Sequence, residues 1–529
     1  MKKLIIILIS VVMVVASCNK DRFEEFYPDP SKIANSTIEK QFTGMINSNV
    51  MWVVPDYWNY FVVLRITSNR WTQSVGWVNS GAQYIPGSAA INDRWNAYYN
   101  FLTQYRVLQE IYENAPEREQ IDKRIYMIAA KIYFYHQTQW SVDLHGDIPW
   151  SEAGMMVATG GDYVQSRPGY DNAEDIYTQM LDDLKAFATE LNNISVIPGI
   201  LTGFRTQDII NNGDIELWRR YCNSLRLRML TRVSGVPAFQ QRASSEIAEI
   251  LQNPATYPVI QENSQNVQID IFSQDTPIHS RNFRTGLEDW NGNLAGKVML
   301  DHLVTNEDPR LRVLFQPALV DGNFIDEWVG IDPLALETAQ TALIETGTVS
   351  RYNWSTLSRN QYFPGVLLNA AEVDFIKAEY YLRAGNDAMA KASYESGIAK
   401  STEFYYGLRA ISNNNDSPEY EPFTIEEINN YLAQEHVSWD AASTTAEKLN
   451  LIGTQKWIHF NVVQSYDNWA EVRRLKYPQL NFWVDTSEDQ SLPPYRWIYA
   501  DSERIYNADN YASVQANDRL DVKLFWDVN

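Results

Sequence analysis

Cysteine, histidine and basic residues are all scarce in this chain of 529 residues. It has 2 cysteines and 6 histidines, and its 44 Lys and Arg face 66 Asp and Glu, giving a formal net charge of −22. So few cysteines leave ordinary packing to hold the fold together. The scattered histidines have no zinc-ligand spacing, and an acidic surface repels phosphate backbones. The sequence therefore predicts no metal and no nucleic-acid partner.

Long linkers and catalytic motifs are missing as well. No Gly/Ser-rich or Pro-rich stretch divides the chain, so residues 31–529 are expected to form a single body. The sequence contains no Gly-x-Ser-x-Gly elbow, Walker loop, Rossmann fingerprint or Asp-x-Asp-x-Asp-Gly calcium loop. We therefore predict a protein that is not an enzyme, with no catalytic residues and no cofactor.

The first 18 residues have the pattern of an export signal. Two lysines precede an apolar run from Leu4 to Val15, interrupted only by Ser10, which suits a signal peptide but is too short to span a bilayer. The following Ala16-Ser17-Cys18 resembles the lipobox of bacterial lipoproteins, in which the cysteine is acylated after cleavage. We expect a signal peptide at 1–17, lipid on Cys18 and a tether over 18–30. An ordinary signal peptide with a chance cysteine is the alternative. A lipidated Cys18 would leave Cys222 alone and exclude an intramolecular disulfide.

Apolar residues recur at helical spacing in paired segments, as in the stripe of Trp95, Tyr98, Leu102 and Tyr105. Small residues such as Gly397 stand where two helices would approach closely, a habit of tetratricopeptide-type hairpins. The predicted fold class is mainly α, a tetratricopeptide-like scaffold of helical pairs with little β-structure. The pairs are expected at about 92–140, 172–234, 369–404 and 424–463.

Long segments without helical or strand spacing separate these pairs. Loops of this length in a compact protein are usually binding elements. We therefore expect a second, loop-rich lobe that carries the ligand site, built from about 64–92, 236–290 and 320–365.

Aromatic residues make up 13% of the chain, and several lie in polar segments that offer no face to bury them. An exposed ring can stack on the C–H face of a sugar while amides and arginines bind the hydroxyl groups. The alternative is that these rings plug the core between the lobes. The predicted ligand contacts are Arg70, Trp71, Trp77, Asn79 and Tyr84, then Trp290 and Asn291 on a turn-like sequence, and Tyr352 and Trp354.

Several phrases, taken in order, resemble the SusD/RagB family of surface nutrient-binding lipoproteins. They are 143–150 (DLHGDIPW), 218–228 (WRRYCNSLRLR), 306–311 (NEDPRL), 370–379 (AAEVDFIKAE) and 468–474 (NWAEVRR). The resemblance implies four tetratricopeptide-like pairs, a loop-rich ligand lobe and a SusC-like TonB-dependent transporter as partner. It also implies an outer-membrane protein that faces the cell exterior and touches the membrane through its lipid anchor only. The charged residues of these phrases, such as Glu372, Glu379 and Arg474, are interpreted as architectural.

Four functions remain open at this point. The favoured one is capture of an oligo- or polysaccharide and its delivery to the transporter. Within the same scaffold, an oligopeptide-binding protein resembling RagB is the second, and a structural adaptor without a nutrient ligand is the third. A surface glycosidase is the weakest. An open aromatic platform would favour glycan, whereas a closed cavity with a charge for a terminus would favour peptide. An adaptor would bury Trp71, Trp77, Trp290 and Trp354, and a glycosidase would oppose two carboxylates beside a ring.

Overall fold

The computed structural model describes residues 36–156 and 159–529, and helices dominate it. The expected signal peptide, Cys18 and the tether lie outside the described residues. Within the described ranges the strands are two to four residues long and form only two-stranded sheets. The predicted mainly α fold class is confirmed. None of the helices in these ranges has the combination of length and hydropathy that crossing a bilayer requires.

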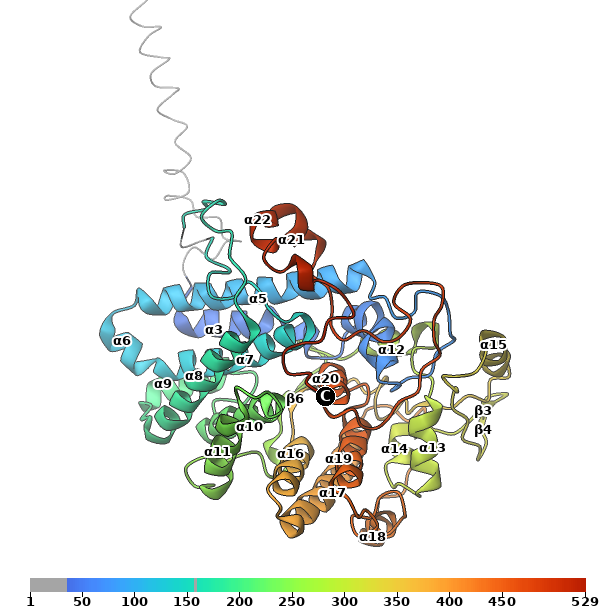
Figure 1. Cartoon of the computed structure of the whole chain (residues 1–529). Helices are drawn as coiled ribbons and strands as arrows, with labels where there is room; N and C mark the ends of the chain where they lie inside the picture. The colour runs from blue at the N-terminus through green and yellow to red at the C-terminus, as the bar shows by residue number, and fades with distance from the viewer. Residues whose placement is uncertain (1–35, 157–158) are drawn as a thin grey trace, which may run out of the picture.

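A first group of helices fills one half of the molecule (Figure 1). The apolar stripes of the sequence form its buried faces, since Trp95, Leu102 and Tyr105 are all buried. The group consists of α3 (Ile38–Asn47), α5 (Ser88–Glu113), α6 (Glu117–Asp122), α7 (Arg124–His145), α8 (Ala173–Asn193), α9 (Pro198–Gln207), α10 (Ile215–Val233) and α11 (Gln240–Gln252).

A second group contains a closely packed helical hairpin. Asn369 caps its first helix, because the Asn369 side chain accepts a hydrogen bond from the backbone N–H of Glu372. Gly397 on the second helix lies against the ring of Phe375, where an added Cβ would be 2.5 Å from a ring carbon. Only a glycine fits this approach. The group consists of α16 (Ala370–Arg383), α17 (Asp387–Ala410), α18 (Ile425–Leu432), α19 (Thr445–Phe460) and α20 (Ser465–Leu475).

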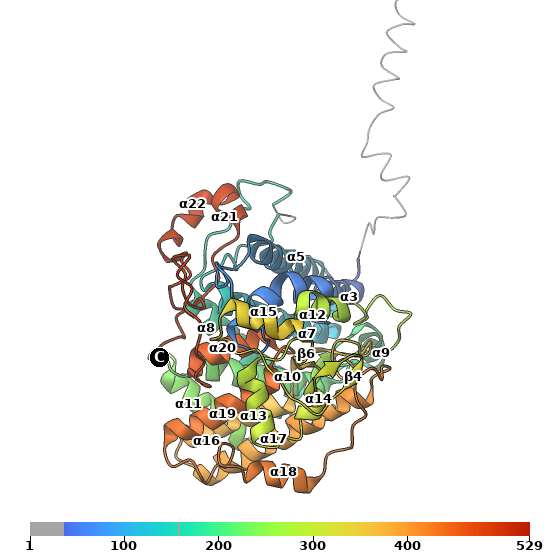
Figure 2. The ribbon, with the colours of Figure 1, turned by 90° about the vertical axis from the view of Figure 1, so that its right-hand side faces the viewer.

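Short helices and two-stranded sheets form a third region, which we call the loop-rich face and which faces the viewer in Figure 2. Two small helices, α21 (Asp501–Tyr506) and α22 (Ala508–Tyr511), project beyond α5 at the top of Figure 1. The elements of the loop-rich face are η2 (Trp58–Val63), η3 (Leu64–Ile66), α4 (Ser68–Trp71), α12 (Phe283–Glu288), η5 (Asp289–Asn291), α13 (Lys297–Thr305), α14 (Leu311–Leu314), α15 (Glu337–Glu345), β2 (Phe315–Gln316), β3 (Leu319–Val320), β4 (Asn323–Phe324) and β5 (Arg351–Tyr352). Strands β1 (Val267–Ile269) and β6 (Gly365–Leu368) link this face to the helices.

Part of the segment expected to be irregular is helical. Residues 236–290 contain α11, which packs against α10 and belongs with the first group of helices. Ala243, Ile247 and Ile250 form its buried stripe, so a helical spacing is present in the sequence there. The expectation of an irregular segment is wrong for Gln240–Gln252.

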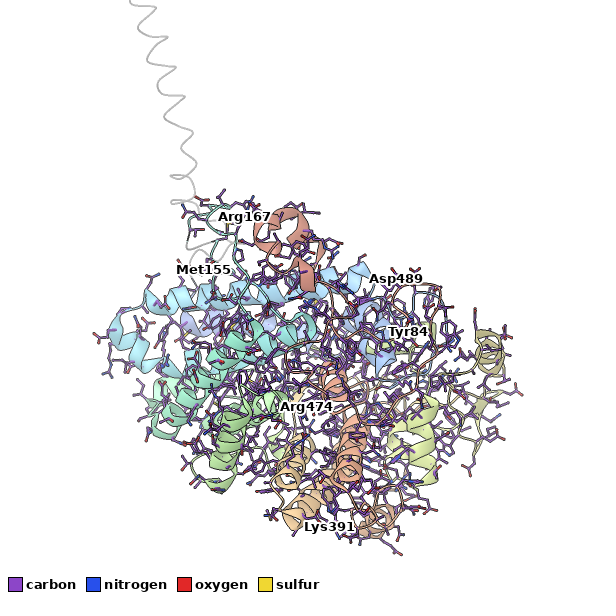
Figure 3. All side chains as sticks on the ribbon, viewed as in Figure 1. Tyr84, Met155, Arg167, Lys391, Arg474 and Asp489 are labelled. Atoms are coloured by element: carbon purple, nitrogen blue, oxygen red, sulfur yellow. The ribbon has the colours of Figure 1, made fainter. Side chains whose placement is uncertain are left out.

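Charged side chains from α10, α16, α19 and α20 meet at the centre of the molecule, where Figure 3 places Arg474. Arg474 donates to Glu379 at 2.6 and 2.8 Å and to Glu471 at 2.6 Å. Arg228 holds Glu372 through a second bidentate contact. All five side chains are buried, which confirms that the charges of the family-like phrases are architectural. We call these residues the central charge cluster; it also contains Arg232, Lys456 and Asp467.

Candidate functional site

Trp290 stands on an exposed turn that follows α12. Its side chain is 83% exposed, the highest fraction among the large hydrophobic side chains of the described residues. The backbone there is left-handed, with φ 56° at Trp290 and 57° at Asn291. Such a conformation costs a non-glycine residue about 1–3 kcal/mol, so the surrounding packing must impose it. Gly292 permits that packing, because an added Cβ would lie 2.8 Å from the carbonyl oxygen of Leu287.

Two further rings lie beside Trp290 and come from the η2 region. The Phe61 centroid is 6.4 Å from that of Trp290 at 70°, and Tyr57 stacks on Phe61 at 5.0 Å and 14°. The Arg65 guanidinium carbon lies 4.2 Å from the Phe61 centroid. Tyr57, Phe61 and Arg65 are all half-buried, so each keeps an accessible surface. The η2 segment is a π-helix, a rare form that is frequent at functional sites. We call Tyr57, Phe61, Arg65 and Trp290 the Trp290 platform.

The platform is attached firmly to the core beneath it. The Tyr60 ring packs against Phe283 of α12 with centroids 4.6 Å apart, and its hydroxyl donates to the carbonyl oxygen of Val462. On the surface, the Asn282 amide donates to the Asp56 carboxylate at 2.9 Å and joins α12 to η2. Two distant segments therefore hold the rings in one arrangement before any ligand arrives.

Trp354, another of the predicted ligand contacts, is covered by an ion-paired arginine. The Arg359 guanidinium carbon is 3.8 Å from the Trp354 centroid, and its nitrogens donate to both oxygens of Glu288 at 2.9 Å. Arg359 also donates to Asp416 at 2.7 Å. Trp354 is half-buried and one face of its ring is already stacked, so it lies at the margin of the candidate site.

Five of the nine predicted contacts are buried, and the expectation that they are exposed is wrong. Trp71 is 1% exposed because its ring packs against Trp469, with centroids 5.0 Å apart, and against Trp497. In this respect the structure favours the alternative, a ring that plugs the core. The five are Trp71, Trp77, Asn79, Tyr84 and Tyr352.

The other buried members hold the loop-rich face together through hydrogen bonds, three of them to backbone carbonyls and that of Trp77 to the side chain of Gln83. The Asn79 amide donates to Pro333 and Ala335 at 2.9 and 3.0 Å, and the Tyr352 hydroxyl donates to Ser74 at 2.7 Å. The Tyr84 hydroxyl donates to Trp483 at 2.7 Å, and Figure 3 shows Tyr84 on the side of the molecule where α12 lies. The Trp77 indole donates to Gln83 at 2.9 Å. These buried residues therefore support the loops of the loop-rich face and are not exposed on it.

Three arginines near the platform have no carboxylate within 4.0 Å in the described part of the chain. Arg65 donates through Nε to the Phe61 carbonyl oxygen, and Arg351 donates through Nη1 to that of Val349. The Nε of Arg70 is buried without a partner. Burial lowers the pKa of each guanidinium, to about 10 at Arg70, where the charge of Arg65 lowers the pKa further. A guanidinium is cationic at neutral pH, so all three carry a charge without a carboxylate partner.

Tyr57, Phe61 and Arg65 are members of the site that sequence reasoning missed. A signal exists, because residues 57–61 read Tyr-Trp-Asn-Tyr-Phe after Pro55-Asp56, an unusual density of rings. No helical or strand spacing separates the buried rings of this run from the accessible ones. Their proximity to Trp290, more than two hundred residues later, has no local signature.

Other hollows of the surface lie away from the platform and are lined by residues outside the predicted set. One, of about 210 Å³, lies between α10, α11 and α16 and includes Tyr380 and Trp526. Another, of about 460 Å³, lies beside α19 and includes Trp457 and Tyr477. Over residues 36–156 and 159–529 no three His, Cys, Asp or Glu side chains gather as a metal site requires.

Comparison with known proteins agrees with the fold. A family of SusD-like proteins, described as starch-binding and associating with the outer membrane, matches residues 31–500. A Bacteroidetes AC2a SusD-like structure superposes with a TM-score of 0.73 at 22% identity, covering 93% of this chain and 100% of its own. A SusD homolog from Bacteroides fragilis gives 0.72 at 18% identity, with 93% and 100% covered. A chitin-binding SusD homolog from Flavobacterium johnsoniae gives 0.69 at 23% identity, with 93% and 99% covered. No curated protein matches the chain.

Proposed function

Because the chain belongs to the SusD-like family, we propose that it captures oligo- or polysaccharides at the cell surface and binds them on the Trp290 platform. Glycan binding of this kind is named for related structures, one of which is chitin-binding, and for the family, which is described as starch-binding. Within this family function, we assign the binding site of the present chain to the Trp290 platform.

One observation carries the proposal, the 83% exposure of Trp290 on a rigid left-handed turn. An exposed indole that lies beside further rings forms an apolar patch of the kind that marks binding sites, and the C–H face of a sugar ring is a suitable cover. The neighbouring rings of Phe61 and Tyr57 extend the surface by a second stacking position. An open arrangement of this kind favours a glycan over a peptide, which would need a closed cavity around its termini. A structural adaptor would bury all four tryptophans of the predicted set, and Trp290 is exposed.

We assign the ligand contacts to the platform and its edges. Trp290 and the rings of η2 stack on the sugar, and the Asn291 amide and Arg65 guanidinium bind its hydroxyl or charged groups. Arg70 and Trp354 form the margin of the site. The ligand lobe of this proposal consists of the segments 64–92, 236–290 and 320–365, without α11, together with residues 57–63 and Asn291. The chain acts by binding and not by catalysis.

We further propose that the bound glycan is delivered to a SusC-like TonB-dependent transporter. The support is the family description, association with the outer membrane, together with the lipobox-like end at Cys18. A lipid anchor on the outer face of the outer membrane would keep the protein beside such a transporter. The oligopeptide-binding alternative uses the same anchor and partner and differs only in cargo.

Replacing Trp290 with alanine is expected to weaken glycan binding by about fivefold to a hundredfold, since stacking on an aromatic ring contributes about 1–3 kcal/mol. Thermal stability should change little, because the side chain is exposed. Titration calorimetry of the full chain in detergent against polysaccharides and peptides measures the affinity. Scanning calorimetry of the same protein measures the thermal stability. Tyr506→Ala, which removes an exposed ring on α21, is the matched control. A panel in which only peptides bind, or in which Trp290→Ala binds as the wild type does, contradicts the proposal.

Fatty-acid labelling tests the anchor separately. Cells supplied with radioactive palmitate should label the wild-type protein and the Cys222→Ser variant, whereas Cys18→Ser should lose the label completely. Cys222 is a good control because it is buried and burial raises the pKa of its thiol to about 12, which keeps it unreactive. Label retained in Cys18→Ser would exclude acylation at that residue.

A further inference from the structure

Three guanidinium groups at or near the Trp290 platform carry no paired carboxylate in the described residues, although the chain as a whole is strongly acidic. Elsewhere in the described residues many arginines are neutralised by Asp or Glu, as Arg359 is by Glu288 beside the same turn. Arg65, Arg70 and Arg351 are not, and the buried Nε of Arg70 lacks any partner. Partly buried charges are normally paired, so the unpaired Arg65 of the platform, with Arg70 and Arg351 near it, indicates that a ligand supplies the opposite charge.

We propose that the platform selects glycans that bear carboxylate groups, that is, polysaccharides with uronic acid units. This inference rests on the proposed function and names the substrate class of the same site. A uronate unit has an apolar C–H face that stacks on Trp290 and a carboxylate at its edge. The carboxylate accepts the forked hydrogen bonds of a guanidinium, which suit its two oxygens.

The geometry places a cation where the edge of a stacked sugar would lie. Arg65 extends over the Phe61 ring, and its Cδ would be 3.0 Å from a Cβ added to Gly292, two residues after Trp290. Arg70 lies close enough to Arg65 for each charge to oppose the other, and its guanidinium carbon is 5.8 Å from the Trp77 centroid. A carboxylate between them would relieve that repulsion.

The acids of this region are already engaged, with one exception. Glu288 and Asp416 are both held by Arg359, and Glu288 also lies 3.8 Å from Arg284. Asp56 accepts hydrogen bonds from Asn282 and from the backbone N–H of Trp58. Asp289, next to Trp290, is exposed and opposes an anionic ligand. It therefore offers a substitution with the opposite expected effect.

The test uses the full chain in detergent and calorimetry with matched pairs of polysaccharides. Polygalacturonate and alginate are each compared with the same polymer after reduction of its carboxyl groups to alcohols. The wild type should bind each charged polymer about tenfold or more tightly than its neutral twin, since a charge-assisted hydrogen bond contributes at least that factor. Arg65→Gln should remove this preference, so that each charged polymer binds no more tightly than its neutral twin. Rising salt should weaken the binding of the charged polymers only.

Two variants keep the test independent of folding. Asp289→Asn should bind the charged polymers about two- to threefold more tightly at low salt, because one exposed repulsive charge is removed. Arg118→Gln removes an exposed, ion-paired arginine of α6 and should bind as the wild type does. An unchanged affinity of Asp289→Asn together with full binding by Arg65→Gln would overturn the carboxylate assignment.

The failure of this inference is distinct from the failure of the glycan proposal. Equal affinity for a charged polymer and its reduced twin overturns the preference and leaves glycan binding in place. Binding of dextran sulfate as tight as that of the uronates overturns the carboxylate assignment, because sulfate then suffices. If acidic peptides bind and no polysaccharide does, both the inference and the proposed function are wrong.

Discussion

Replacing Arg228 with alanine is expected to lower the free energy of unfolding by about 3–5 kcal/mol, because the change leaves buried carboxylates without a cation. Arg228 contacts both oxygens of Glu372 and lies 3.4 Å from Asp467. Neither acid can reach water, since both side chains are at most 3% exposed. The remaining charges of the central cluster are already used by other acids, as Arg474 is by Glu379 and Glu471.

Urea and thermal unfolding of Arg228→Ala measure the loss, and pH gives a second readout. Burial raises the pKa of Asp467 to about 7, and the charge of Arg228 lowers it, so the variant raises this pKa further. When the pKa of a carboxyl is higher in the folded than in the unfolded state, the free energy of unfolding of the protein falls as pH rises from the unfolded-state pKa to the folded-state pKa. The destabilisation should therefore be larger at pH 8 than at pH 5. Arg118→Ala, which breaks an exposed pair with Asp122, should cost less than about 1 kcal/mol. A similar cost in both variants would show that the cluster does not stabilise the fold.

Replacing Trp71 with alanine is expected to cost about 3–5 kcal/mol, the range for truncating a buried tryptophan. The ring lies at the junction of α4 with the C-terminal segments and contacts Trp469 and Trp497. Its removal leaves a cavity between segments that are far apart in sequence and cannot close easily around it. The same measurement on Trp290→Ala should show a change within about 0.5 kcal/mol, because that ring is exposed.

The pair of tryptophan variants separates core from site. Trp71→Ala should lower the melting temperature and, at a temperature where it is folded, retain most of the ligand affinity. Trp290→Ala should do the reverse. If Trp71→Ala melted like the wild type, the ring would not be part of the core, and its contacts with Trp469 would have to be loose.

The scaffold could be predicted from the sequence because its information is local. The stripe from Trp95 to Tyr105 repeats at the helical period, and the small residue at Gly397 marks the approach of α16 and α17. The same local information is present in α11, whose buried stripe contains Ala243, Ile247 and Ile250. The expectation that this segment is irregular overlooks that stripe.

The candidate site could be predicted only in part. Trp290 lies on a turn-like sequence of polar residues and glycine, and its exposure follows from that local pattern. Trp71 and Trp77 lie in an equally polar segment, yet both are buried, Trp71 by chain that follows some four hundred residues later. Burial by distant segments leaves no trace in a local window, so the two kinds of tryptophan look alike in the sequence. The pairing of Phe61 with Trp290 is hidden for the same reason.

The contacts between the first and last parts of the chain also determine when the molecule can be completed. Trp71 can pack only after Trp469 and Trp497 have been synthesised. The Tyr60 hydroxyl, which lies under the platform, likewise has its hydrogen-bond acceptor only once Val462 is present. A chain that emerges from a ribosome with its N-terminus first can form the early helices on its own. The Trp290 platform cannot reach its final arrangement until nearly the whole polypeptide is present. A nascent or truncated product therefore has no finished surface with which to compete for nutrient.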